Sequence, residues 1–348
     1  MKKLIILALI GVVLFSSGCV NLPWGNSGTT TTGGYGLVVN YFEPDFSNLE
    51  SGDDFQIEME VQNMGGATAE DIYTYLYGIT PSDWGLSESD LGKEIGNLEP
   101  PDENVGLPGE IDSAKWDLTA PNIPEGITYT YTPRARVMYK YHTVATSVVT
   151  TLSRDEYSRL RQKNEVPSGQ PQTTISKGPL SVSVSARNPV ILDSPQDTIR
   201  VIITVGTLGQ GSVFDYNKAS DCGGYKGVTD INTTCGLNSL EMKIVAPGTT
   251  AKDCSALDNY KSVDLRRGQS LTYSCELDPG DITTRKDIPI TVYLKYGYME
   301  DFSTTLTVTG TSKVSVESTE TTTTTTQETT TTTVASTTTT TSTTTTTD

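Results

Sequence analysis

The chain has 348 residues, enough for two domains of ordinary size. Its 42 acidic and 25 basic residues give a formal net charge of −17, and Lys and Arg form no cluster. Nucleic acid and anionic lipid surfaces are excluded as partners, because both require clustered basic side chains. We expect a solvated acidic surface that keeps the protein soluble.

Residues 1–18 have the layout of a secretory signal peptide. Two lysines precede an unbroken apolar run that ends at Phe15, and small residues follow. The run is too short to cross a hydrocarbon core of ~30 Å, which needs roughly 20 helical residues. We therefore predict an exported protein.

The end of this signal resembles a lipobox, in which the signal is cut before a cysteine whose thiol carries a lipid. Ser17, Gly18 and Cys19 match, whereas Ser16 stands where a branched aliphatic residue is usual. The resemblance implies attachment to membrane lipid through Cys19, on the outer face of the cytoplasmic membrane. An ordinary signal that happens to have a nearby cysteine is the alternative.

Residues 19–35 have no sustained apolar period and should form a tether. From residue 36 to residue 152, short β-rich runs with turn punctuation predict an all-β sandwich. Its clearest strand covers residues 55–61, where apolar and polar residues alternate. Residues 135–141 and 144–152 are expected to close the set as a hairpin.

A short helix and a linker are predicted over residues 153–178. Ser153 and Glu156 have the spacing of a capping box, which indicates a helix to about Lys163. Two prolines and no periodicity follow, so residues 166–178 are predicted to be the linker between two domains.

The second half, residues 179–312, repeats the first. The alternation at residues 199–205 lies 144 positions after the alternation at residues 55–61, and Gly209 lies 144 positions after Gly65. A duplicated element predicts a second β-sandwich.

Five cysteines divide into Cys19 and a set of four in the second half. In an exported protein an even set of this kind predicts two disulfides, and we prefer nearest-neighbour pairing among the three alternatives. Zinc is the alternative, but the chain has one histidine and no Cys-x-x-Cys spacing. The four residues are Cys222, Cys235, Cys254 and Cys275.

Two features suggest glycosylation. Asn232 lies in the only Asn-x-Ser/Thr site, within the loop expected between Cys222 and Cys235. Residues 313–348 form a tail with 22 threonines in its last 30 residues. This composition predicts a disordered, O-glycosylated stalk, with a bare tail as the alternative.

No catalytic or metal-binding residue is predicted. His142, the one histidine, is expected in the turn of the hairpin, and no Gly-x-Ser-x-Gly elbow accompanies it. We therefore expect no enzyme and no cofactor. Calcium at Asp53 and Asp54, or at Glu99, Asp102 and Glu103, is the alternative considered, and solvated turn acids are preferred.

Tyr73, Tyr75 and Tyr77 share one face of a predicted strand. Such a stripe can bind sugars by stacking. The simpler interpretation is a half-buried core edge, and both stay open.

The order of a strand, Pro44, an acidic turn, an alternating strand and Asn63-Met64-Gly65-Gly66 is similar to CARDB-type immunoglobulin-like domains of archaeal surface proteins. The resemblance covers residues 36–152 and 179–310. It implies a tandem immunoglobulin-like fold and a surface location, without an activity.

These observations predict a non-enzymatic cell-surface lipoprotein with a structural, adhesive or scaffold role, whose partners are envelope proteins or surface glycans. A carbohydrate- or ligand-binding accessory module of a membrane complex is one alternative. A hydrolase that uses the carboxylates of the loop at residues 78–112 is the other.

Overall fold

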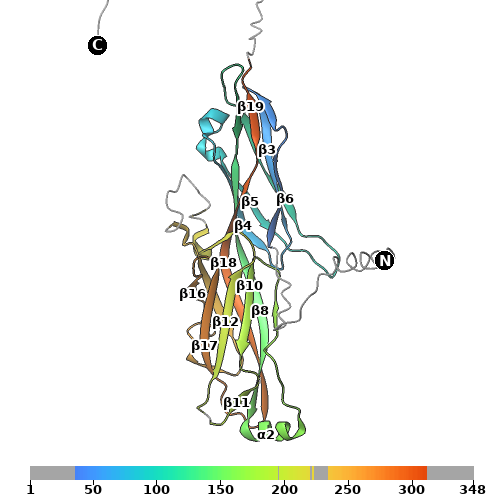
Figure 1. Cartoon of the computed structure of the whole chain (residues 1–348), viewed down its shortest axis with the longest axis vertical. Coiled ribbons are helices and arrows are strands. Elements are labelled where there is room, and N and C mark those ends of the chain that lie inside the picture. Colours follow the sequence, from blue (N-terminus) through green and yellow to red (C-terminus); the bar gives the residue numbers. More distant parts are fainter. Residues whose placement is uncertain (1–35, 195, 220–221, 223–233, 312–348) are drawn as a thin grey trace, which may run out of the picture. The chain divides into compact units, whose positions relative to one another are not determined.

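The computed structural model describes residues 36–194, 196–219, 222 and 234–311, and these residues belong to one compact unit (Figure 1). The predicted all-β class is confirmed at the level of a β-sandwich-like protein with several antiparallel sheets. Its elements are β1 Leu37–Pro44, β2 Asn48–Glu50, β3 Asp54–Asn63, β4 Ala69–Tyr77, η1 Pro81–Trp84, η2 Glu88–Asp90, β5 Gly92–Leu98, β6 Ile111–Thr119, β7 Thr128–Tyr131, β8 Arg134–Ser153, α2 Arg154–Lys163, β9 Thr173–Ile175, β10 Leu180–Ala186, β11 Val190–Leu192, β12 Ile199–Thr207, β13 Ser212–Phe214, η3 Tyr216–Lys218, β14 Ser239–Val245, β15 Thr250–Asp253, β16 Lys261–Asp264, β17 Ser270–Asp278, β18 Arg285–Ser303 and β19 Leu306–Thr309.

The two alternating stretches form equivalent strands. β3 lies between β1 and β6, and β12 lies between β10 and β17, in both cases with antiparallel pairing. The apolar residues of each strand point into the core, and the residues between them are more exposed. The period-two prediction is therefore confirmed in both halves.

The predicted hairpin at residues 135–152 is wrong, because β8 is one continuous strand of 20 residues. His142 lies within this strand, opposite Lys295, and not in a turn. The reason is that the inward positions continue without interruption through Tyr141, Thr143 and Ala145, all of which are buried.

β8 and β18 form the central ladder of the largest sheet, whose order is β16-β14-β18-β8-β4-β5 (Figure 1). Their antiparallel register runs from Arg134 opposite Ser303 to Leu152 opposite Arg285. The ladder continues into β7 and β19, and β19 also pairs in parallel with β2. Strands from both sides of the expected boundary at residues 153–178 are thus joined by hydrogen bonds, and the number of domains stays a prediction.

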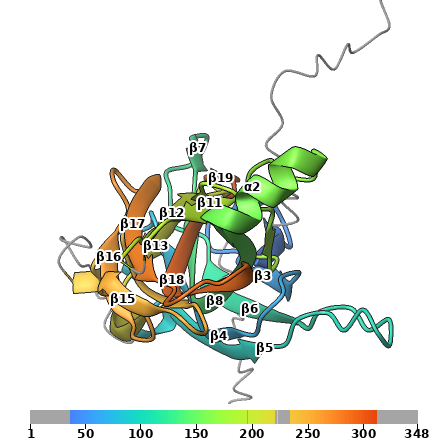
Figure 2. The ribbon, with the colours of Figure 1, turned by 90° about the horizontal axis from the view of Figure 1, so that it is seen from below.

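The expected helix is confirmed as α2. The Ser153 hydroxyl accepts the amide of Glu156 at 3.3 Å, as a capping residue should. The Glu156 carboxylate accepts from Arg159 instead of completing the capping box. α2 packs against β8 and β11 (Figure 2).

Two disulfides are present, Cys222–Cys235 and Cys254–Cys275, with Cα atoms 5.3 and 4.6 Å apart. This is the nearest-neighbour arrangement. The first pair packs with Met138, Phe214 and Met299 in a small core separate from the main one. Two disulfides indicate an extracytoplasmic protein.

Candidate binding site

Four buried tyrosines lie opposite one another on the paired strands β8 and β18. Tyr139 and Tyr141 come from β8, and Tyr296 and Tyr298 come from β18. Ring centroids lie 5.8 Å apart for Tyr139 and Tyr298, and 6.2 Å apart for Tyr141 and Tyr296. These spacings are in the range of favourable aromatic pairs, so the cluster fixes the inward face of the ladder at this level.

The hydroxyl groups of this cluster bind backbone groups of neighbouring turns. Tyr141 Oη accepts the amides of Gly66 and Ala67 at 2.9 and 3.2 Å and donates to the Lys177 carbonyl at 3.1 Å. Tyr298 Oη accepts the amide of Gly211 at 3.0 Å. The cluster therefore anchors turns that belong to different sheets.

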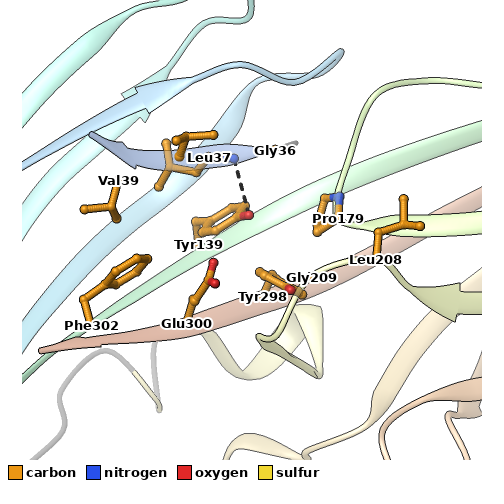
Figure 3. Close-up of a pocket in the computed structure, with 11 residues that line it drawn as sticks. Gly36, Leu37, Val39, Tyr139, Pro179, Leu208, Gly209, Tyr298, Glu300 and Phe302 are labelled. Atoms are coloured by element: carbon orange, nitrogen blue, oxygen red, sulfur yellow. Dashed lines mark hydrogen bonds between the residues drawn. The ribbon is translucent and has the colours of Figure 1, made fainter. Parts of the chain in front are cut away.

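A pocket of about 560 Å³ opens beside Tyr139 and Tyr298 (Figure 3). The start of β1, the segments before β10 and after β12, and the end of β18 supply its walls. The Leu37 amide donates to Tyr139 Oη at 3.4 Å across one wall. The lining residues are Gly36, Leu37, Val38, Val39, Tyr139, Pro179, Leu208, Gly209, Tyr298, Glu300 and Phe302.

Glu300 is the one charged residue of this lining. It lies on β18 between Tyr298 and Phe302, in the register of the inward-facing residues, and is half-buried. Burial, followed by the charge of Asp301, raises the pKa of its carboxyl group. Burial, followed by the charge of Glu300, also raises the pKa of Tyr298 to about 12.

The pocket can hold a small molecule by apolar contact and present one carboxylate to it. A volume of this size is ordinary for a ligand site. No histidine, cysteine, lysine or arginine is among the lining residues. Among the described residues, no group of His, Cys, Asp and Glu side chains could hold a metal ion.

Sequence reasoning missed Glu300, although a signal for it existed. The inward positions of β18 from Ile288 to Tyr298 are apolar or aromatic, and Phe302 continues the pattern. Glu300 therefore interrupts a period-two run with an acid, which is the pattern of a carboxylate placed in a core-facing position.

The predicted tyrosine stripe does not form an exposed platform. Tyr75 is buried, and Tyr73 and Tyr77 are half-buried. The Arg136 guanidinium lies over the Tyr77 ring at 5.6 Å from its centroid. This placement favours core-edge packing over sugar stacking.

The acids proposed for calcium or hydrolysis do not converge. Asp53 accepts the Glu50 amide, and Asp54 accepts the Thr119 hydroxyl. Glu103 pairs with Lys177 at 2.7 Å, so its charge already has a partner. All the acids of residues 78–112 are exposed, namely Asp83, Glu88, Asp90, Glu94, Glu99, Asp102, Glu103, Glu110 and Asp112.

His142 is half-buried on the outward face of β8, beneath the ring of Tyr216 at 5.4 Å between centroids. Burial lowers the pKa of its imidazole; the nearby Glu70 opposes this shift and Lys295 reinforces it. Tyr216 Oη donates to the Glu70 carboxylate at 2.9 Å, and burial, followed by this bond, raises the pKa of Tyr216 to about 12. The histidine therefore supports the packing of η3 on the sheet.

Cys19, Asn232, the signal peptide, the tether and the tail all lie outside the described residues. Within the described part of the chain, no helix is long and apolar enough to cross a membrane.

Comparison with known proteins identifies no family and only distant structural similarities. No family model and no curated protein sequence matches the chain. Among solved structures, the chain is similar to red sea bream transglutaminase, with 9% identity and a TM-score of 0.18 over 79% of this chain and 31% of that chain. It is also similar to the secreted serine protease VesC from Vibrio cholerae, with 7% identity and a TM-score of 0.18 over 77% of this chain and 51% of that chain. Similarities this distant give no information about activity or partners.

Proposed function

We propose that the protein is a non-enzymatic cell-surface lipoprotein with a structural, adhesive or scaffold role, held at the outer face of the cytoplasmic membrane by lipid on Cys19. The immunoglobulin-like, CARDB-type character of its two halves belongs to this proposal. The observation that carries it is the β8–β18 ladder, which ties strands of both halves into one disulfide-bonded β protein. A rigid β framework outside the cytoplasm suits the presentation of surfaces to envelope proteins or glycans.

Proximity cross-linking on intact cells tests this role. We expect recovery of other envelope proteins or surface glycans, because a scaffold must touch them. Recovery of lipids and the protein itself alone would count against the proposal.

The anchor has its own experiment. Cys19→Ser should release the protein into the medium, because the proposed attachment depends on lipid at this thiol. A two-chain lipid is required for this outcome, since one acyl chain binds membranes only marginally. Cys254→Ser, with Cys275→Ser, is the matched control, because it removes two cysteines that form a disulfide in the described part of the chain and should leave membrane retention unchanged. Retention of Cys19→Ser at the membrane would refute lipid anchoring.

A second candidate function is a ligand-binding accessory module, and the pocket beside Tyr139 and Tyr298 favours it. Its walls come from segments far apart in the sequence, and it contains a half-buried carboxylate. The tyrosine stripe, in contrast, does not support this role. Thermal-shift screening of the secreted protein against small molecules tests it: ligands that raise the unfolding temperature should lose their effect when Val39→Trp, at a partly exposed position of the lining, fills the pocket.

A further inference from the structure

Glu300 places a carboxylate where the pattern of β18 calls for an apolar side chain. Half-burying a carboxylate is unfavourable unless hydrogen bonds or an opposite charge compensate it. Among the described residues, none donates a hydrogen bond to Glu300 or forms an ion pair with it, although neighbouring Asp301 pairs with Arg136 at 2.6 Å. The compensating group is therefore missing from the described part of the chain.

The surroundings of Glu300 define the chemistry of that group. The partly exposed Phe302 ring lines the pocket, and the buried rings of Tyr139 and Tyr298 lie beneath it (Figure 3). Aromatic faces attract ammonium groups with apolar substituents, because the ring quadrupole favours a desolvated cation. A carboxylate in the same pocket adds a full opposite charge.

We propose that this pocket binds a small organic cation, an ammonium group with apolar substituents, with Glu300 as its counter-charge. The inference rests on the second proposed function, that the protein binds a ligand here. A metal ion fits less well, because one carboxylate and apolar walls supply too few oxygen ligands. An anionic ligand would be repelled by Glu300.

Isothermal titration calorimetry on the secreted protein tests the inference with two probes of the same shape. Choline carries the positive charge, and 3,3-dimethylbutan-1-ol is its neutral carbon isostere. We expect choline to bind at least tenfold more tightly than the isostere. Glu300→Gln should weaken choline binding at least tenfold and leave isostere binding unchanged. Glu94→Gln, at an exposed position of β5, is the matched control and should bind choline as the wild type does.

Phe302→Leu separates the aromatic contribution from the charge. It keeps an apolar side chain of similar reach but removes the ring, so choline binding should weaken several-fold while isostere binding stays within twofold. Equal affinity for both probes, with no effect of Glu300→Gln, would overturn the inference and leave the ligand-binding function standing. Absence of choline binding at millimolar concentration would also overturn it, and thermal-shift screening would then decide the ligand-binding function separately.

Discussion

Tyr141 and Tyr298, 157 positions apart, make the same contact in the two halves: each hydroxyl accepts a backbone amide from the glycine turn that follows an alternating strand. Gly66 follows β3, and Gly211 follows β12. A Cβ atom on Gly65 would collide with the Tyr141 hydroxyl, and one on Gly209, 144 positions later, would lie 2.6 Å from the Tyr298 hydroxyl. The glycine spacing repeated along the sequence therefore reflects a repeated tyrosine contact.

Tyr141→Phe should destabilise the protein by about 2–3 kcal/mol. The substitution leaves the Ala67 amide without its acceptor, and it removes one of two partners from the Gly66 amide and from the Lys177 carbonyl, which keep their mutual bond at 3.0 Å. An unpaired polar group costs ~1–3 kcal/mol, and a lost hydrogen bond ~0.5–1.5 kcal/mol. Urea unfolding measures the change. Tyr298→Phe, which loses one amide partner, should cost about 1 kcal/mol, and an equal or larger effect for Tyr298→Phe would contradict this account.

Gly297→Ala should lower the free energy of unfolding by about 1–3 kcal/mol, the usual cost of overpacking. A Cβ atom here would meet the ring of Phe214, which packs on Gly297 in the small core beside the Cys222–Cys235 disulfide. Gly206→Ala in β12 is the control, because its Cβ atom would lie 3.1 Å from the Ser181 hydroxyl oxygen, at the end of a side chain that can move. Equal stability of both variants in denaturant would show that the Phe214 ring adapts freely.

His142→Gln should make stability less dependent on pH below about 6.5. Burial lowers the pKa of His142 in the folded protein, so the unfolded chain takes up the proton first. Stability therefore falls as pH decreases from the ordinary value of 6.5 towards the lowered one. Glutamine does not titrate, and melting temperatures across pH 5–8 should show a shallower slope. An unchanged slope would contradict this account of His142.

Glu300→Gln should raise the melting temperature at pH 7 in the absence of ligand. Burial raises the carboxyl pKa, so the folded protein holds the proton more tightly than the unfolded chain. Stability of the wild type therefore falls as pH rises from the ordinary value of 4.5 through the raised one. Below pH 4 the two proteins should melt alike, and a lower melting temperature of Glu300→Gln at pH 7 would mean that the carboxylate stabilises the fold.

Much of the fold could be predicted from the sequence because its signals are local. The alternation at residues 55–61 and 199–205 identifies strands from side-chain periodicity alone, and Ser153 marks the start of α2 through a bond three residues away. The long β8 could not be predicted in the same way. Thr143 is polar and follows His142, so the sequence suggests that the strand ends there. In the structure its hydroxyl is hydrogen-bonded at 2.7 Å to the hydroxyl of Tyr296, 153 positions away.

The pocket could not be predicted from the sequence either, because it also depends on contacts between distant segments. Glu300 is visible as an acid at an inward position, but the walls around it come from the beginning of β1, from Pro179 and from Leu208. Only the pairing of β8 with β18 brings these segments together. Period-two patterns reveal which side of a strand is buried, whereas they do not reveal where the packing is left open.

The β8–β18 ladder also determines when the sheets can form during synthesis, because it joins strands far apart in the sequence. β8 leaves the ribosome more than 130 residues before its partner at Arg285–Ser303. In the same way, β7 and β2 can pair only after β19 has been synthesised. The first half therefore cannot complete its sheets as a nascent chain. Long-range pairing of this kind makes folding slow, and backbone amides of β4, β8 and β14 should gain protection from hydrogen exchange together, late, and only in chains that extend past Thr309.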